Sequence, residues 1–247
     1  MKRALLAAAI GLLLCTTHGA VLAEPAVPAF SRMTAGGPID GWRAFRPAPK
    51  AADTRYSVVT DEGVPVLKAE ARSSMSALTH TVRVDTRRFP LLRWRWKVET
   101  PVAQADMTRK TGDDYAARIY VMFDYPRARL PLSTRLAMAV AESVYGQQIP
   151  TAALNYVWDN RQPVGTIRPN AYTDRARMVV VRSGTAGQGQ WHTETRDLRA
   201  DFRAAFGEDP PDVVGLAIAT DTDNTASQAL AWFGDITFLP QAERPVP

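Results

Sequence analysis

Apolar and polar residues alternate with a period of two along most of this chain, and this alternation predicts β-strands. The clearest case is residues 91–100 (LLRWRWKVET), where positions 92, 94, 96 and 98 are apolar and the intervening positions from 93 to 99 are charged. Residues 113–125 (DDYAARIYVMFDY) alternate in the same way. Because successive side chains of a strand point to opposite faces, each segment predicts one face packed in a core and one directed outwards.

Further strand signals follow the same rule. Residues 55–71 (RYSVVTDEGVPVLKAEA) read as two strands joined by a turn at Asp61-Glu62-Gly63, which predicts a hairpin. The remaining strand candidates are SALTHTVRVDT, ALNYVW, RARMVVVRSG, QWHTETRDL, DVVGLAIAT and ALAWFGDITF.

Two segments have helical periodicity instead. Near 131–147 an apolar residue recurs at every fourth position, which predicts a helix inserted between strands. A second, shorter helix is predicted near 198–206, with Asp197 as a candidate cap and Gly207 as a stop. The apolar stripe of the longer helix consists of Leu132, Leu136, Val140 and Val144.

The order of these elements predicts the fold class. Some nine or ten strands with no strand–helix–strand alternation and no repeat favour a mainly all-β fold, an antiparallel β-sandwich of the jelly-roll type. We expect a single domain over 41–239, since no break in composition divides it. Residues 24–40, rich in Pro, Ala and Gly, predict an extended lead-in, and 240–247 a disordered tail.

Residues 1–23 are typical of a secretory signal peptide. Two basic residues precede the apolar run ALLAAAIGLLLC, and small residues before Glu24 suit cleavage after Ala23. A membrane anchor would need an apolar run of roughly 20 residues, which this one does not reach. A lipid anchor on Cys15 is disfavoured because Leu14 precedes it. We therefore expect a periplasmic or secreted protein without a membrane span once the signal is cleaved.

Charge and the rarer residue types narrow the function. The 30 basic and 25 acidic residues are interleaved, with no Lys/Arg run of the kind that follows a phosphate backbone, so we expect no nucleic-acid partner. The single cysteine lies in the signal, which excludes a cysteine nucleophile or a cysteine zinc site from the mature chain. With only His80 and His192 beyond the signal, a histidine-rich zinc site is excluded as well.

The stretch 221–225 (DTDNT) is the densest group of oxygen-bearing side chains. Asp221 and Asp223, together with Asp235 in the next strand segment, are candidate ligands for a structural calcium ion, which prefers hard oxygens. The stretch lacks the glycine and glutamate of an EF-hand loop. Two alternatives stay open: a turn, because Asp, Asn and Thr also bond their own backbone, and a pair of catalytic carboxylates.

A second set of polar residues occupies alternate positions of several strands. If those strands share a concave face, Arg95, Asp114, Arg118, Tyr120 and Glu194 line one groove that could bind sugar hydroxyls or acidic groups. The alternative is an outward polar face with ordinary salt bridges.

Aromatic residues are candidates for stacking on sugar rings. Among them, Tyr115, Tyr156 and Trp158 lie nearest to loops and are the preferred platform, whereas at least three of the tryptophans are expected in the core. The tryptophans concerned are Trp94, Trp96, Trp158, Trp191 and Trp232.

Five separated motifs, PLLRWRWKV, GDDYAARIYVMF, LNYVW, ATDTDNT and WFGDITF, occur in this order. Together they resemble the domain of unknown function 3047 family of bacterial exported proteins, from about Gly41 to Leu239. That resemblance implies no activity. The strand order and the closing GDI strand are also similar, at the level of fold, to the galactose-binding-like jelly rolls of carbohydrate-binding modules, which often contain a structural calcium ion.

The sequence thus predicts a periplasmic or secreted binding module for a carbohydrate or another polar envelope ligand, with calcium as a candidate structural ion. Two alternatives remain: a hydrolase or lyase that acts on glycans through carboxylates of the same groove, such as Asp114, Glu194 or Asp221, and a domain for protein–protein interaction in the envelope. The prediction leans towards a protein that is not an enzyme. Catalytic residues and oligomeric state are not predicted.

Overall fold

The computed structural model describes residues 24–47, 50–145 and 150–241. In this part of the chain, twelve strands form a seven-stranded sheet, in the order β1-β4-β11-β6-β7-β9-β8, and a five-stranded sheet, in the order β10-β5-β12-β3-β2. The predicted signal peptide and most of the predicted tail lie outside the described residues. The strands are β1 (Arg43–Phe45), β2 (Arg55–Asp61), β3 (Val64–Arg72), β4 (Met75–Val84), β5 (Leu91–Val98), β6 (Tyr115–Phe123), β7 (Ala152–Asp159), β8 (Ile167–Pro169), β9 (Ala176–Ser183), β10 (His192–Asp197), β11 (Val213–Asp221) and β12 (Gln228–Leu239).

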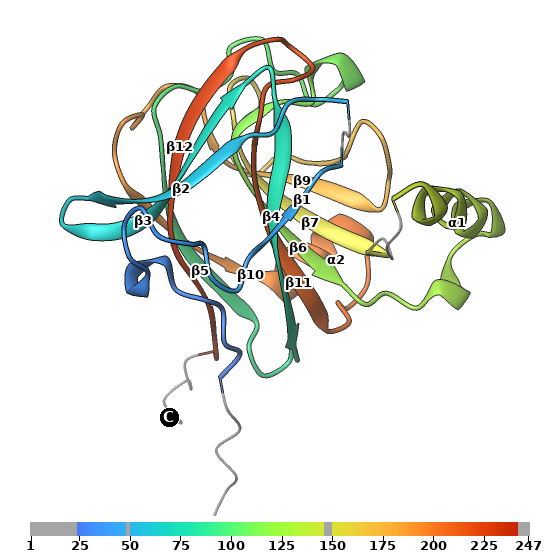
Figure 1. Ribbon diagram of the computed structural model, residues 1–247. Coiled ribbons are helices and arrows are strands. Elements are labelled where there is room, and N and C mark those ends of the chain that lie inside the picture. The colour runs from blue at the N-terminus through green and yellow to red at the C-terminus, as the bar shows by residue number, and fades with distance from the viewer. Residues whose placement is uncertain (1–23, 48–49, 146–149, 242–247) are drawn as a thin grey trace, which may run out of the picture.

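The two sheets pack face to face as a β-sandwich, which confirms the predicted fold class (Figure 1). Aromatic rings from both sheets meet in the core: Trp94 of β5 lies 5.2 Å from Tyr156 of β7, and Trp96 lies 6.2 Å from Trp158. One pairing differs from a fully antiparallel sheet, because β7 and β9 run parallel. The short strand β8 separates them in the chain and takes the sheet edge beside β9.

The alternation in β5 and β6 places their side chains as predicted. The apolar residues of β5 at positions 92, 94, 96 and 98 are at most 1% exposed and face the core, so Arg93, Arg95 and Lys97 point away from it. In β6, the residues at positions 119, 121 and 123 are fully buried between the sheets. Arg118 and Tyr120 therefore point to the opposite side of the seven-stranded sheet. This alternation decides where each candidate site can lie.

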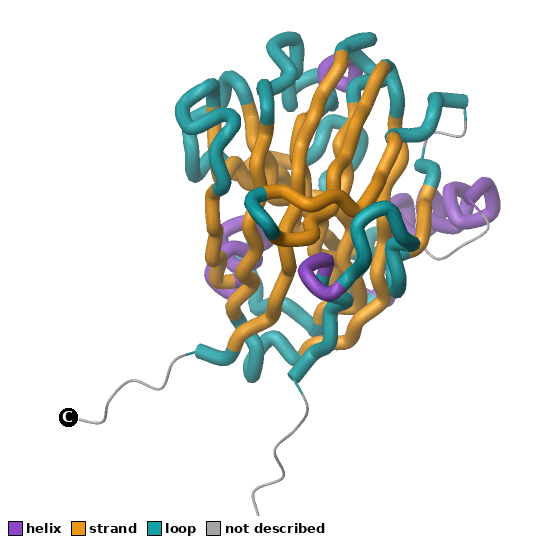
Figure 2. Tube along the Cα trace, turned by 60° about the vertical axis from the view of Figure 1, so that its left-hand side comes forward, coloured by secondary structure: helices purple, strands orange, loops and turns teal. Residues whose placement is uncertain are grey.

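Both predicted helices are present. Helix α2 (Leu198–Phe206) packs on the sandwich through Leu198 and Phe202, is capped by Asp197, which accepts the N–H groups of Arg199 and Ala200, and ends at Gly207 in the left-handed conformation. Helix α1 (Leu132–Tyr145) joins β6 to β7 and projects from the side of the sandwich (Figures 1 and 2). No helix among the described residues is both long and apolar enough to cross a membrane.

The apolar stripe of α1 does not face the core. Leu132, Leu136 and Val140 are 63%, 61% and 66% exposed, and among the described side chains of the helix Met138 is the buried one. The side chain of Val144 lies outside the described ones. The four-residue period predicted the helix correctly, but it did not show which side the helix turns towards the sandwich.

The lead-in is more closely packed than an extended segment. Phe30, in the short 3-10 helix η1 (Phe30–Arg32), is fully buried, and its ring stacks on that of Trp42 at 5.4 Å. The neighbouring residue, Ser31, donates hydrogen bonds from its backbone and its hydroxyl to Asp235 of β12. The segment before β1 is thus a structural part of the domain.

Candidate functional site

Four aspartates and one arginine gather at one end of the seven-stranded sheet. Asp113 and Asp114 precede β6, and Asp221 ends the antiparallel neighbour β11, so the two strands bring them to the same edge. A register shift between Ala219 and Asp221 sets Asp221 opposite the start of β6. We name this group the carboxylate cluster; it consists of Asp113, Asp114, Arg118, Asp221 and Asp223.

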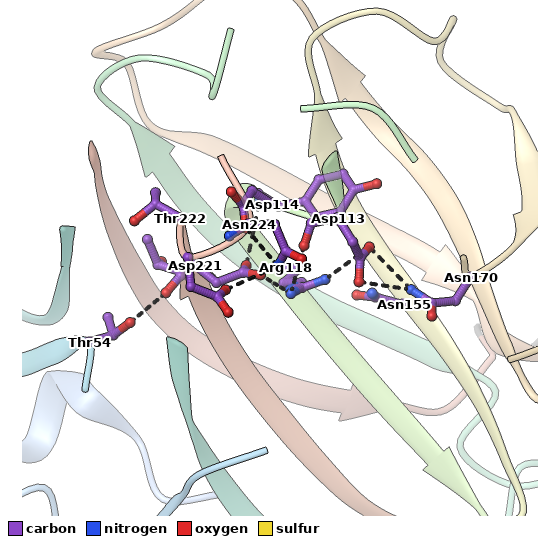
Figure 3. Close-up of polar contacts among 12 residues, drawn as sticks. Thr54, Asp113, Asp114, Arg118, Asn155, Asn170, Asp221, Thr222 and Asn224 are labelled. Carbon is purple, nitrogen blue, oxygen red and sulfur yellow. Dashed lines mark hydrogen bonds and ion pairs between the residues drawn. The ribbon is translucent and has the colours of Figure 1, made fainter. Parts of the chain in front are cut away.

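Arg118 is the central cation of the carboxylate cluster (Figure 3). It is 2% exposed, and its Nη2 donates to Oδ2 of Asp221, while its Nη1 lies 3.6 Å from Oδ1 of Asp113. Asn170 donates its amide to both oxygens of Asp113 at 3.2 Å. Buried carboxylates are stable only when they are paired or hydrogen-bonded, so Arg118 allows two of them to coexist.

Asp114 holds the loop that follows β11. Its Oδ1 accepts the backbone N–H and the amide of Asn224, at 3.2 and 3.3 Å, and its Oδ2 accepts the N–H and the hydroxyl of Thr225, at 2.7 and 2.6 Å. A carboxylate has about four acceptor positions, and all four are used here. The stretch DTDNT is therefore a turn anchored by the side chain of a neighbouring segment.

Burial changes the acidity of this cluster. Loss of solvent raises the pKa of Asp221 well above its ordinary value, with the negative charges of Asp113, Asp114 and Asp223 acting in the same direction and Arg118 opposing them. Burial also raises the pKa of Asp113, again against the opposing effect of Arg118. The pKa of Asp223 is raised by the same burial and by the charge of Asp114. The cluster has more negative charge than one arginine neutralises, and it holds protons more tightly than isolated aspartates.

The calcium prediction can be compared with these donors. Asp114, Asp221 and Asp223 each offer an oxygen, and these atoms lie within 4.8 Å of one another. Asp235 is not among them, because it lies in β12 and bonds Ser31; the prediction that it joins Asp221 and Asp223 is wrong. Calcium needs about six to eight oxygens, whereas the acceptor positions of Asp114 are filled and Asp221 is bound by Arg118. The donor set therefore fits an arginine better than a calcium ion.

The five residues expected to line one groove lie in three places. Asp114, Arg118 and Tyr120 lie together on the seven-stranded sheet, with the Arg118 guanidinium 5.6 Å from the Tyr120 ring. Arg95 lies on the outer face of the five-stranded sheet. Glu194 pairs in register with the core-facing Trp94, and it accepts hydrogen bonds from Trp96 and from Arg182 of β9. The groove does not form because the strands place these side chains on different faces of the two sheets.

The outer face of the five-stranded sheet holds a layered group of aromatic and charged side chains. The ammonium of Lys97 lies 4.4 Å from the Trp232 ring and 5.3 Å from the Trp191 ring, and the Arg95 guanidinium lies 4.3 Å from the Trp191 ring. Both tryptophans are half-buried. Asp61 accepts hydrogen bonds from Lys97 at 2.5 Å and from the indole N–H of Trp191 at 2.7 Å. We name this group the tryptophan platform; it consists of Asp61, Arg95, Lys97, Trp191 and Trp232.

The β2–β3 hairpin completes the platform from across the sheet. It turns at Glu62 and Gly63, both with positive φ, as the hairpin signal predicted. Strand β2 is separated from β5 by two other strands, yet Asp61 at its end bonds Lys97 of β5. The hairpin must therefore curl over the outer face. The hydrogen bonds of Asp61 lower its pKa, chiefly through Lys97, so Asp61 is ionised at neutral pH.

Beside the platform lies a hollow of about 360 Å³. Arg95 belongs to both, so the hollow and the platform are continuous. Gly234 of β12 also lines the hollow, and the Arg95 side chain passes over it. A Cβ at this position would lie 2.4 Å from Cγ of Arg95, so a larger residue would displace that side chain. The polar residues around it are Ser31, Arg93, Arg95, Thr193, Asp235 and Thr237.

A comparison with known protein families identifies the family of this chain. The model of the family described as "Protein of unknown function (DUF3047)" matches residues 40–237. This chain belongs to that family. Within the matched region, RWRWKV lies in β5, the strand that contributes to both the platform and the hollow, and GDDYAAR and TDTDNT contain the carboxylate cluster. No curated protein matches the sequence.

One solved structure with a similar arrangement is the family 30 carbohydrate-binding module of the cellulosomal cellulase Cel9D-Cel44B of Clostridium thermocellum. The identity is 13%, the match covers 77% of this chain and 84% of that one, and the TM-score is 0.36. At that score the likeness supports no argument about a ligand. The function of the DUF3047 chain is therefore argued from its own residues.

The prediction of which aromatic residues form an exposed platform is wrong. Tyr115, Tyr156 and Trp158, the preferred platform residues, are at most 1% exposed, and they belong to the core or pack below loops. Trp94, Trp96 and Trp158 are core residues, as expected of at least three tryptophans. A signal for the platform was present in Trp232, which alternates with the buried Ala231 and Phe233 and must point outwards.

Proposed function

We propose that this protein is an exported, non-enzymatic binding module for a carbohydrate or another polar component of the cell envelope, and that the tryptophan platform is its binding surface. The observation behind the proposal is the pair of half-buried tryptophans fixed beside cations and an open hollow on one sheet face. Sugars present apolar ring faces and polar hydroxyl edges, and recognition sites combine aromatic surface with a few placed polar groups.

The platform is ordered before any ligand arrives. The Lys97 side chain is 11% exposed, since two indole rings and Asp61 surround it. The indole N–H of Trp191 is also bound to Asp61. Side chains that are already fixed lose little conformational entropy on binding, so such a surface can bind a ligand with little reorganisation.

Binding is favoured over cleavage by the placement of the acids. Glycoside hydrolysis needs two carboxyl groups about 5 Å or roughly 6.5–9.5 Å apart at the bound sugar. Among the described residues of the hollow and the platform, Asp235 and Asp61 are the acids. Asp235 accepts two hydrogen bonds from Ser31, and Asp61 accepts hydrogen bonds from Lys97 and Trp191. The acids of the carboxylate cluster are on the other sheet and are occupied by internal partners.

The test is calorimetric titration with a panel of neutral and acidic envelope glycans, using the wild type and Trp191→Ala. We expect at least one glycan to bind and the variant to lose about tenfold or more in affinity, because a stacking face of this size is removed. Tyr172→Ala, which removes a 55% exposed tyrosine from another part of the surface, is the matched control and should bind normally.

Three outcomes would overturn the proposal. Release of reducing ends or unsaturated products from any glycan of the panel would show a hydrolase or lyase instead. Failure of every glycan to bind the folded wild type would leave an envelope protein–protein interaction domain as the better interpretation. Normal binding by Trp191→Ala would place the ligand away from the platform.

A further inference from the structure

The hollow beside the tryptophan platform is lined by two arginines, Arg93 and Arg95. On the same sheet face, Lys97 is paired with Asp61 at 2.5 Å and Lys68 with Glu70 at 3.1 Å. Neither Arg93 nor Arg95 has an ion pair or a hydrogen bond to another described residue. The hollow thus contains two cations whose charged donors are available.

From this we infer that the ligand is an acidic glycan, and that Arg93 and Arg95 bind its carboxylate, sulfate or phosphate oxygens in the hollow. The inference rests on the proposed function and names the ligand class of the same site. Guanidinium groups bind oxyanions through a planar fork of N–H donors, with stronger hydrogen bonds than neutral donors make.

The strand geometry brings the two arginines together. They are two residues apart in β5, so they project from the same face with their Cα atoms roughly 6.5–7 Å apart. Thr193 of β10 lies opposite Arg95 and Thr237 of β12 lies opposite Arg93, and both threonines line the hollow. An oxyanion bound between the arginines would therefore meet additional hydrogen-bond donors.

The Arg95 side chain is held in place by contacts that do not use its N–H donors. Its guanidinium lies 4.3 Å from the ring centroid of Trp191, and its aliphatic part crosses β12 where Gly234 leaves space. The cation–π contact with the ring uses none of the guanidinium N–H groups in a hydrogen bond to a described residue, so these donors can bind a ligand. Trp191 thereby connects a sugar stacked on the platform to an acidic group in the hollow.

The single carboxylate of the hollow does not neutralise these arginines. Asp235 accepts the Ser31 N–H at 2.9 Å and the Ser31 hydroxyl at 2.5 Å, and no ion pair links it to Arg93 or Arg95 among the described residues. With two guanidinium groups and one carboxylate, the hollow has an excess of one positive charge. A neutral sugar would leave that positive charge without an ionic partner.

The experiment compares matched ligands. An oligogalacturonide, its methyl ester and a sulfated oligosaccharide are titrated into the folded wild type, Arg93→Gln and Arg95→Gln, together with the neutral members of the panel above. We expect acidic glycans to bind at least tenfold more tightly than neutral ones and each variant to lose that preference. Arg168→Gln removes an exposed arginine of β8 in the other sheet and should keep it. Whether the uronate or the sulfated ligand binds better identifies the oxyanion.

The outcomes separate this inference from the proposed function. Equal affinity for acidic and neutral glycans, or an acid preference that survives both substitutions, overturns the inference and leaves a glycan-binding module. No binding by any glycan overturns both. Circular dichroism establishes that each variant is folded; Arg93 is exposed, so its substitution should leave the melting temperature within a few degrees of the wild type.

Discussion

At the scale of single residues, Arg118 shows how a buried charge can organise a turn. Arg118 binds Asp221 and lies beside Asp113, and Asp114 in turn holds the loop after β11. Removal of one partner of such a group leaves an uncompensated buried charge, which costs about 3–5 kcal/mol. The polar density of DTDNT is thus explained by folding.

The raised pKa values of this cluster predict a pH dependence of stability. For Asp113 and Asp221 the folded pKa lies above the ordinary value of 3.8, so the folded state binds protons more tightly than the unfolded state. The stability from these protons is complete below about pH 4 and is lost as pH rises through the folded pKa values. We therefore expect the melting temperature to fall as the pH is raised from about 4 through the raised pKa values of these aspartates, as followed by circular dichroism.

Asp113→Asn provides the control for this pH effect. The substitution also changes contacts to Arg118, so the quantity to compare is the slope of the melting temperature against pH. The variant should give a shallower slope. Asp61, whose pKa is lowered, contributes stability that is lost only below about pH 4 and does not interfere. An identical slope in variant and wild type would contradict the assignment.

At the scale of elements, the two helices show what periodicity can and cannot decide. Both have apolar residues every four positions, yet Phe202 of α2 is fully buried and Leu136 of α1 is 61% exposed. Phe202→Ala should cost about 3–5 kcal/mol of unfolding free energy, since it leaves a cavity. Leu136→Ser should change it by about 0.5 kcal/mol or less.

Urea unfolding of both helix variants measures this difference directly. A large loss of stability for Leu136→Ser would show that the α1 stripe is covered in the folded protein. Ala205→Ser, at a partly buried position of α2, serves as the control for helix propensity, because it introduces serine into a helix without removing a large side chain.

The strands were more predictable than the sites they build. Alternation in β5 fixed the core face of Trp94 and the outer face of Arg95, because a strand has only two faces. It could not show that Arg118 and Arg95 lie on opposite outer faces, which depends on which sheet each strand joins. The partners of Asp114 and the approach of Asp61 to Lys97 join residues far apart in the chain, and no local pattern encodes such contacts.

At the scale of the whole molecule, the sandwich separates two polar centres. The tryptophan platform lies on the outer side of the five-stranded sheet, and the carboxylate cluster lies on the outer side of the seven-stranded sheet, with the aromatic core of Trp94, Tyr156 and Trp158 between them. One face has half-buried rings and available arginines, and the other has internally satisfied acids. Under the proposed function, the first face serves recognition and the second face serves stability.

This separation predicts opposite effects of two substitutions. Arg118→Met should lower the melting temperature by on the order of 10 °C, because Asp221 loses its partner, and should leave glycan affinity unchanged at 20 °C. Trp191→Ala should weaken glycan binding while stability changes far less. Sites that share no partners act additively, so the double variant should show the sum of both effects in paired melting and titration experiments. A folded Arg118→Met variant that no longer binds would move the ligand to the carboxylate cluster and return Arg118 and Tyr120 to the binding site.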